Sequence, residues 1–182
     1  MQDREGLDRA YATPEGIFTD GATEYIAGTK SFGDIVDDLA IPLGMTRGTA
    51  RYESAARTLA ANPQVRRVIG HSLGGAVAMQ LQEDIPSLKS RTYGAPALSF
   101  SGSGERFRSL GDPISMFDFG ARETAPTTWN PHSYQDVANR TEPPPEHETP
   151  ASKIGTITDG TFTAPGSTAA PAAQTGVDYE IA

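Results

Sequence analysis

The chain has 182 residues, a length typical of one domain, and it contains no cysteine. The lack of thiols excludes a disulfide scaffold, a cysteine-ligated zinc or iron–sulfur centre and a cysteine nucleophile. With 15 Lys and Arg against 23 Asp and Glu, the net charge is −8. An acidic surface argues against electrostatic binding of nucleic acid or of an anionic membrane.

The N-terminal residues are polar and mixed in charge, unlike a secretory signal, and no stretch reaches the ~18 apolar residues of a membrane-spanning helix. Mean hydropathy is −0.41, and the low apolar content is unevenly distributed: from Thr141 onward the chain is rich in Pro, Thr, Ala and Gly and has only two aromatic residues, Phe162 and Tyr179. We therefore predict a folded domain over residues 8–140 and a linker with a largely disordered tail over 141–182. Within that tail, Asp159-Gly160 indicates a short hairpin.

The first half of the domain begins with two β-prone runs, Gly16–Thr19 and Glu24–Ala27, around a turn, which predict either a hairpin or two successive strands. Ser31–Leu39 then carries apolar residues at helical spacing. Thr46–Ala61 is rich in strong helix formers and is the clearest predicted helix of the chain.

The second half continues with a short apolar strand at Arg66–Gly70 and a helix at Gly74–Glu83. Two further strands are predicted at Lys89–Tyr93 and Pro113–Phe117. Because strands alternate with helices, the fold class expected is α/β, with a mostly parallel sheet flanked by helices.

A Gly-x-Ser-x-Gly pattern connects the predicted strand to the helix, as Gly70-His71-Ser72-Leu73-Gly74. In a tight strand-to-helix turn, a side chain at either glycine would collide with the neighbouring strand or helix, while the serine hydroxyl is exposed. The helix N-terminus would stabilise a developing oxyanion, and the N–H of Leu73 is its natural first donor. Ser72 is therefore the candidate nucleophile.

A serine nucleophile needs a base, and the chain has three histidines. His71 is adjacent to the serine, and its side chain would leave the turn in another direction, so it is expected to support the turn. His147 lies among prolines and glutamates in the predicted tail. His132, in a loop beyond the last predicted strand, remains as the candidate base.

The acid that orients the base should follow a strand and lie between the serine and the histidine in the chain. Three residues meet this condition: Asp112, Asp118 and Glu123. Asp112 begins a turn before Pro113, where backbone donors can hold its carboxylate. Asp118 directly follows the apolar run.

Taken with its context, the serine motif resembles that of the class 3 lipases, which have the α/β-hydrolase fold and include fungal triacylglycerol lipases and phospholipase A1-like enzymes. The resemblance extends over about Glu24–Tyr134, and further segments match the family in its own order. They are Tyr25-Ile26-Ala27-Gly28-Thr29, Ser31–Leu39, Thr92-Tyr93-Gly94-Ala95-Pro96, Phe107–Ile114 and Asn130-Pro131-His132-Ser133-Tyr134.

The resemblance implies roles for several of these residues. It assigns Asp112, rather than Asp118, as the acid and Thr29 as the second oxyanion donor. It also makes Ser31–Leu39 a lid, whose apolar residues would line an acyl groove if they are not ordinary core packing: Phe32, Ile35, Val36 and Leu39.

The chain also departs from the family pattern. Ala27 replaces the arginine that precedes the glycine, and Gly111 stands directly before the acid without the usual asparagine. His132 follows Ser72 much sooner than in fungal lipases, and the usual first strands and helix are nearly absent. These features suggest a trimmed hydrolase core, such as one excised from a longer viral or multidomain polypeptide.

The expected activity is that of a serine hydrolase that cleaves carboxylic esters through an acyl-enzyme on Ser72. Acyl lipids are the expected substrates, with at most transient contact with a lipid interface, although a small soluble ester also fits the acidic charge. No cofactor or metal is implied. Two alternatives remain: a catalytically inactive module with a structural or interaction role in a larger protein, and a peptidase or acyltransferase on the same fold.

Overall fold

The computed structural model divides into two units, Met1–Pro143 and Pro144–Ala182. The residues that it describes are 1–29, 46–97, 103–116, 118–142, 156–158 and 161–163. The predicted helix Ser31–Leu39 lies outside them. In the second unit, β7 (Thr156–Thr158) pairs with β8 (Thr161–Thr163) in antiparallel fashion, which confirms the predicted hairpin.

The first unit is built on a six-stranded sheet whose strands follow one another in chain order. The first two strands are antiparallel, and every later neighbouring pair is parallel. The strands are β1 (Ile17–Asp20), β2 (Thr23–Ile26), β3 (Arg67–His71), β4 (Lys89–Tyr93), β5 (Glu105–Ser109) and β6 (Arg122–Thr124). A mostly parallel sheet flanked by helices is thus confirmed.

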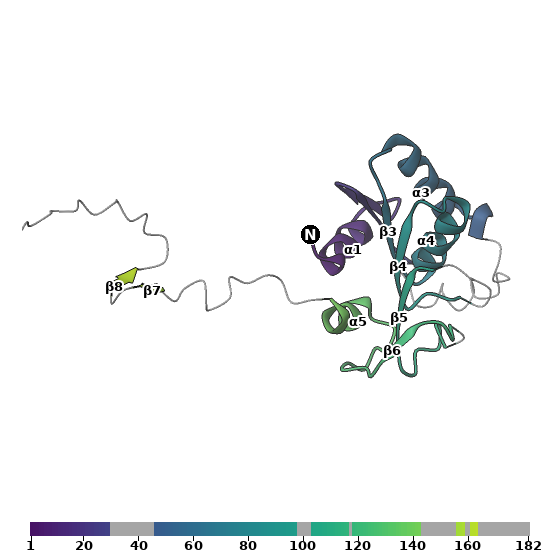
Figure 1. Ribbon diagram of the computed structural model, residues 1–182. Helices are drawn as coiled ribbons and strands as arrows, with labels where there is room; N and C mark the ends of the chain where they lie inside the picture. The colour runs from purple at the N-terminus through teal and green to yellow at the C-terminus, as the bar shows by residue number, and fades with distance from the viewer. Residues whose placement is uncertain (30–45, 98–102, 117, 143–155, 159–160, 164–182) are drawn as a thin grey trace, which may run out of the picture. The chain divides into compact units, whose positions relative to one another are not determined.

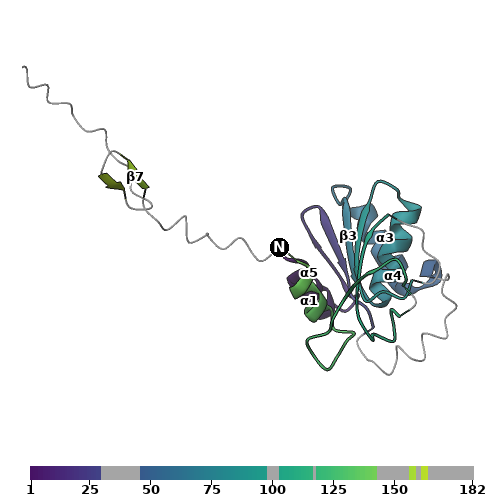
Figure 2. The same cartoon turned by 60° about the horizontal axis from the view of Figure 1, so that its bottom comes forward.

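Helices cover both faces of this sheet (Figures 1 and 2). One apolar cluster joins the sheet to α1 (Asp3–Ala12) and α5 (Tyr134–Thr141). A second joins the opposite face to α3 (Ala50–Ala61) and α4 (Leu73–Asp84). None of the helices among the described residues is long and apolar enough to cross a membrane.

Strand β3 lies in the middle of the sheet and contributes side chains to both clusters. Val68 packs toward α3 and α4, whereas Ile69 packs toward α1 and α5. Successive side chains of a strand point to opposite faces, so His71 lies on the same face as Ile69. This alternation directs the His71 ring toward α1 and α5.

Several predicted elements are confirmed within one or two residues: the β1–β2 hairpin, β3, α4 and β4. The predicted helix Thr46–Ala61 is divided into a short 3₁₀ turn, η1 (Thr46–Gly48), and α3. The division occurs because the Thr49 side chain accepts a hydrogen bond from the Tyr52 N–H and caps α3.

The prediction of a strand at Pro113–Phe117 is wrong, because residues 113–116 form turns. The strand in this region is β5, which begins eight residues earlier. β5 has arginines at two of its five positions, so its sequence lacks the apolar run by which a buried strand is recognised. These arginines are neutralised by later acidic residues: Arg106 pairs with Asp118, and Arg108 with Glu123.

Helix α1 begins before the expected domain start at residue 8, and a buried carboxylate fixes it to the sheet. Asp3 is 4 % exposed and accepts hydrogen bonds from Arg67 at 3.2 Å, Arg91 at 3.1 Å and the Tyr93 hydroxyl at 2.8 Å. All three partners belong to β3 and β4, so long-range charge pairing docks a helix whose own sequence is mostly polar.

Glu24 on β2 is a buried acid with no compensating partner in the part of the chain that the structure describes. It is 0 % exposed, and among the described residues neither carboxylate oxygen has a hydrogen-bond donor. Burial raises the pKa of this carboxyl from 4.5 to about 8. The folded protein therefore keeps the Glu24 proton at pH values where the unfolded chain has lost it.

We expect Glu24→Gln to remove one downward contribution from the pH dependence of stability. Glu24 makes the free energy of unfolding fall as pH rises from 4.5 to about 8, by at most about 1.4 kcal/mol per pH unit, because only the unfolded state releases its proton. Denaturant unfolding across this range measures the slope. The exposed Glu15→Gln serves as the control, and an equal slope in wild type and Glu24→Gln would contradict the expectation.

Candidate active site

The predicted site residues lie at one edge of the sheet, beyond the carboxyl ends of the parallel strands. Thr29 follows β2, Ser72 follows β3, Asp112 follows β5 and His132 follows β6. Parallel strands end on the same side, so residues far apart in the sequence meet there. This edge is also where ligands bind in open α/β sheets.

Ser72 occupies a strained turn between β3 and α4. Its φ of 54° and ψ of −127° make it the one non-glycine residue with positive φ in the described part of the chain. The flanking glycines permit the turn, because a Cβ on Gly70 would lie 2.2 Å from the Gly74 carbonyl oxygen, and one on Gly74 2.2 Å from that of Ile26. The expected reason for both glycines is thereby confirmed.

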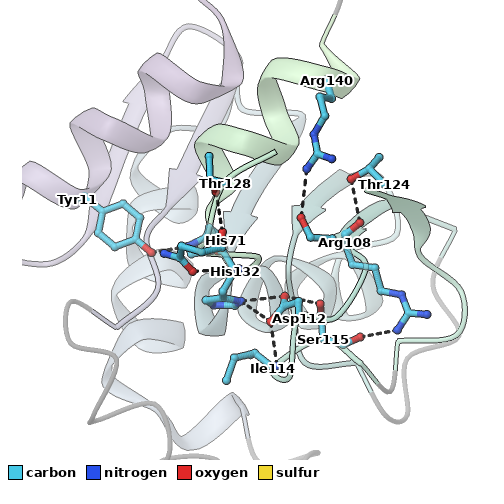
Figure 3. Close-up of polar contacts among 12 residues, drawn as sticks. Tyr11, His71, Arg108, Asp112, Ile114, Ser115, Thr124, Thr128, His132 and Arg140 are labelled. Atoms are coloured by element: carbon cyan, nitrogen blue, oxygen red, sulfur yellow. Dashed lines mark hydrogen bonds and ion pairs between the residues drawn. The ribbon is translucent and has the colours of Figure 1, made fainter. Parts of the chain in front are cut away.

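Asp112 and His132 form a buried pair (Figure 3). The His132 Nδ1 lies 3.0 and 2.9 Å from the two carboxylate oxygens of Asp112. The carboxylate also accepts the Ile114 N–H at 2.9 Å and the Ser115 hydroxyl at 2.5 Å. Burial works to raise the pKa of the Asp112 carboxyl, but the hydrogen bond and charge of His132, together with these donors, hold it below its usual value.

The other two candidate acids have different partners. Asp118 is 2 % exposed and pairs with Arg106 at 3.3 Å. Glu123 pairs with Arg108 at 2.9 Å. Of the three candidates, Asp112 is the residue in contact with His132, which agrees with the role that the class 3 lipase resemblance implies for it.

The loop that carries His132 is fixed on both sides of the residue. The Asn130 side chain accepts the His132 N–H at 3.1 Å, and Ser133 caps α5 by accepting the Asp136 N–H at 3.4 Å. Because the Nδ1–H of His132 donates to Asp112, its Nε2 carries no proton in the neutral ring and can accept one.

The Nε2 of His132 is buried and has no hydrogen-bond partner among the described residues. His132 and Ser72 therefore meet at the same edge without a hydrogen bond between them. Ser72 itself is 1 % exposed and His132 5 %. Hydrogen bonds between a nucleophile and its base are often long without substrate and shorten when substrate binds.

Of the two predicted oxyanion donors, Leu73 directly follows Ser72, and Thr29 follows a glycine that packs against Ser72. Leu73 is the first residue of α4, where helical N–H groups have no partner within the helix and the dipole is positive. Thr29 follows Gly28, and a Cβ on Gly28 would lie 2.8 Å from the Ser72 Cβ. The four residues expected to line an acyl groove lie outside the described residues: Phe32, Ile35, Val36 and Leu39.

Sequence reasoning assigned no role to two contributors to this edge, Gly94 and Tyr11. Gly94 has a φ of 57°, and a Cβ there would lie 3.1 Å from the Asp112 Oδ2 and 3.2 Å from the His132 Nδ1. A glycine directly after a strand was the available signal. Tyr11 on α1 contacts His71, and no local pattern marks it.

A cleft of about 450 Å³ lies at the opposite edge, near the starts of β3, β4 and β5. None of the predicted site residues lines it; its residues are Arg67, Gln82, Lys89, Ser90, Arg91, Ser103, Gly104 and Glu105. Within the described ranges, no cluster of three or more His, Asp or Glu side chains could hold a metal ion.

No known protein family, curated protein or solved structure matches the chain. Fold and site together therefore define a class by their own geometry. It is an α/β protein in which a mostly parallel sheet brings a strained serine turn and a buried His–Asp pair to one edge.

Proposed function

We propose that the chain is a serine hydrolase that cleaves carboxylic esters, acyl lipids in particular, on an α/β-hydrolase-like core. The observation that carries the proposal is the strained backbone of Ser72. A non-glycine residue in this conformation costs about 1–3 kcal/mol and is concentrated at functional sites. The His132–Asp112 pair at the same edge supplies the base and acid that a serine nucleophile needs.

In the proposed reaction, the Ser72 hydroxyl attacks the ester carbonyl while His132 Nε2 takes its proton. Asp112 keeps the proton on Nδ1 and stabilises the imidazolium that forms. The N–H groups of Leu73 and Thr29 bind the oxyanion. His132 then gives the proton to the departing alcohol, and water releases the acid from Ser72 by the same steps in reverse.

The preference for acyl lipids is supported by apolar side chains on the loops that carry the acid and the base. Met116 is 49 % exposed, Phe119 84 % and Trp129 fully exposed. Large exposed apolar groups are typical of surfaces that contact apolar ligands or lipid. Rates on short- and long-chain nitrophenyl esters, with and without micelles, distinguish a lipase from an esterase.

The alternative of a catalytically inactive module is favoured by two observations. Ser72 is nearly inaccessible, and the His132 Nε2 makes no hydrogen bond within the described part of the chain. An inactive module would retain the serine turn for its packing alone. It would then not react with a probe that requires an activated serine.

Labelling with a fluorophosphonate separates the two functions. We expect the wild type to take up one equivalent of probe at Ser72, located by peptide mass spectrometry, and Ser72→Ala to take up none. Ser87→Ala, which alters an exposed serine after α4, should label as the wild type does. A folded wild type that resists the probe would reject the hydrolase and leave the inactive module.

A further inference from the structure

A continuous chain of hydrogen bonds connects α1 with the loops that carry Gly28 and His132, and Figure 3 shows its part from Tyr11 through His71 to His132. The Tyr11 oxygen accepts the Gly28 N–H at 3.0 Å. The Tyr11 hydroxyl lies 2.6 Å from the His71 Nδ1, and the His71 Nε2 lies 2.8 Å from the His132 carbonyl oxygen. The residue before the nucleophile thus holds the backbone of the candidate base.

The partners of this chain fix where each proton lies. A carbonyl oxygen only accepts, so the His71 Nε2 carries a hydrogen and donates it to His132. The His71 Nδ1 is then an acceptor in the neutral ring, and the Tyr11 hydroxyl donates to it. Because the Tyr11 oxygen also accepts the Gly28 N–H, no donor or acceptor in the chain can be reversed without breaking a bond.

We propose that Tyr11 and His71 are positioning residues of this site, which hold the base loop at His132 and the oxyanion loop at Gly28 in a fixed relation to Ser72. This inference rests on the proposed hydrolase function. Neither residue transfers a proton to the substrate. Their role is to keep the reacting groups within the small displacements that catalysis tolerates.

The electrostatics of His71 suit such a role. Burial, and next the neighbouring His132, lower the pKa of His71 to about 3, against the opposing effects of its hydrogen bond and of Asp112. His71 therefore stays neutral at physiological pH, although its ring centroid lies 4.7 Å from that of His132. A charged His71 would disfavour the imidazolium that His132 must become during the reaction.

Tyr134 on α5 offers a matched control for Tyr11. Its ring stacks on that of Tyr11 with centroids 5.3 Å apart, and it also contacts the His71 ring at 4.9 Å. Its hydroxyl, however, donates to Asp8 and not to the chain that leads to His132. Removal of either hydroxyl keeps the aromatic packing, but only Tyr11→Phe interrupts the chain.

We expect Tyr11→Phe to lower kcat per labelled Ser72 by about 10-fold or more, with KM nearly unchanged, because the base is displaced while substrate contacts remain. In Tyr134→Phe, kcat per labelled Ser72 should stay within about twofold of the wild-type value. His71→Asn should lower kcat per labelled Ser72 by about 10- to 100-fold, because a displacement of the base by about 1 Å can cost as much as ~100-fold. His71→Gln, whose longer amide can donate near the position of Nε2, should recover part of that loss.

Normalisation to labelled Ser72 separates positioning from folding, because a variant that only unfolds loses labelled sites and not turnover per site. In the double variant Tyr11→Phe/His71→Asn, kcat per labelled Ser72 should fall by much less than the product of the two single losses, because both changes interrupt the same series of hydrogen bonds. Turnover per site in Tyr11→Phe equal to that in Tyr134→Phe would overturn the proposal.

Nitrogen-15 NMR of the histidine rings tests the chain without any activity. We expect His71 to remain a neutral Nε2–H ring from neutral pH to about pH 4, and Tyr11→Phe, unlike Tyr134→Phe, to shift the His132 signals. An Nδ1–H tautomer of His71, or His132 signals unchanged in Tyr11→Phe, would contradict the proposed chain of hydrogen bonds. If the wild type resists the fluorophosphonate, the hydrolase function is rejected, and with it the positioning role of Tyr11 and His71 in catalysis. The NMR result would still decide whether the hydrogen bonds from Tyr11 through His71 to His132 exist.

Discussion

Ser72→Ala should lower kcat for a carboxylic ester by at least about four orders of magnitude and leave KM within a few-fold, because the acyl-enzyme can no longer form. The residual rate would come from binding and oxyanion stabilisation alone. The Ser72 side chain makes no capping hydrogen bond to α4. Its removal should therefore change the free energy of unfolding by less than about 1 kcal/mol.

The measurement is the initial rate of nitrophenyl ester hydrolysis, together with denaturant unfolding of the same preparations. Ser87→Ala is the matched control and should retain wild-type rates, because Ser87 is exposed at the far end of α4. If Ser72→Ala hydrolyses the ester as fast as the wild type, the nucleophile has been misassigned.

Asp112→Asn should lower kcat by about three to four orders of magnitude at neutral pH with little change in fold, because the two side chains have nearly the same shape. The asparagine amide can donate to the His132 Nδ1 and stabilise the ring with its proton on Nε2, where it cannot accept a proton from Ser72. It also cannot stabilise an imidazolium as a carboxylate does. Both losses slow the chemical step and do not weaken substrate binding, so KM should stay nearly unchanged.

Asp118→Asn is the control for this variant, since Asp118 is also buried and lies in the same loop between β5 and β6. Its partner is Arg106 rather than His132. The change should cost stability, because the ion pair between Asp118 and Arg106 is lost, and leave kcat nearly unchanged. A larger loss of kcat in Asp118→Asn than in Asp112→Asn would make Asp118 the acid.

The sequence predicts well those elements whose pattern is local. The β1–β2 hairpin, the β3–α4 connection and β4 each have a clear apolar run or a glycine at the required place. α5 was missed, although Ser133 is a helix cap and Tyr134, Val137 and Ala138 follow at helical spacing. That signal is short and lies directly beside the predicted tail.

Other elements are stabilised by partners far along the chain, which no local window contains. α1 is mostly polar and is docked through Asp3 to arginines of β3 and β4. The strand pattern of β5 is difficult to recognise because Arg106 and Arg108 interrupt its apolar residues. The acidic partners of these two arginines lie later in the chain. Long-range ion pairs leave no periodic trace in the residues around them.

The sequence by itself determined the turn around Ser72, because the steric demands of a strand, a tight bend and a helix act within a few neighbouring residues. It did not determine from spacing which of Asp112 and Asp118 faces His132, or that Tyr11 reaches His71. Those contacts depend on how the strand ends and the helices of both faces come together, and only the packed sheet fixes these distances.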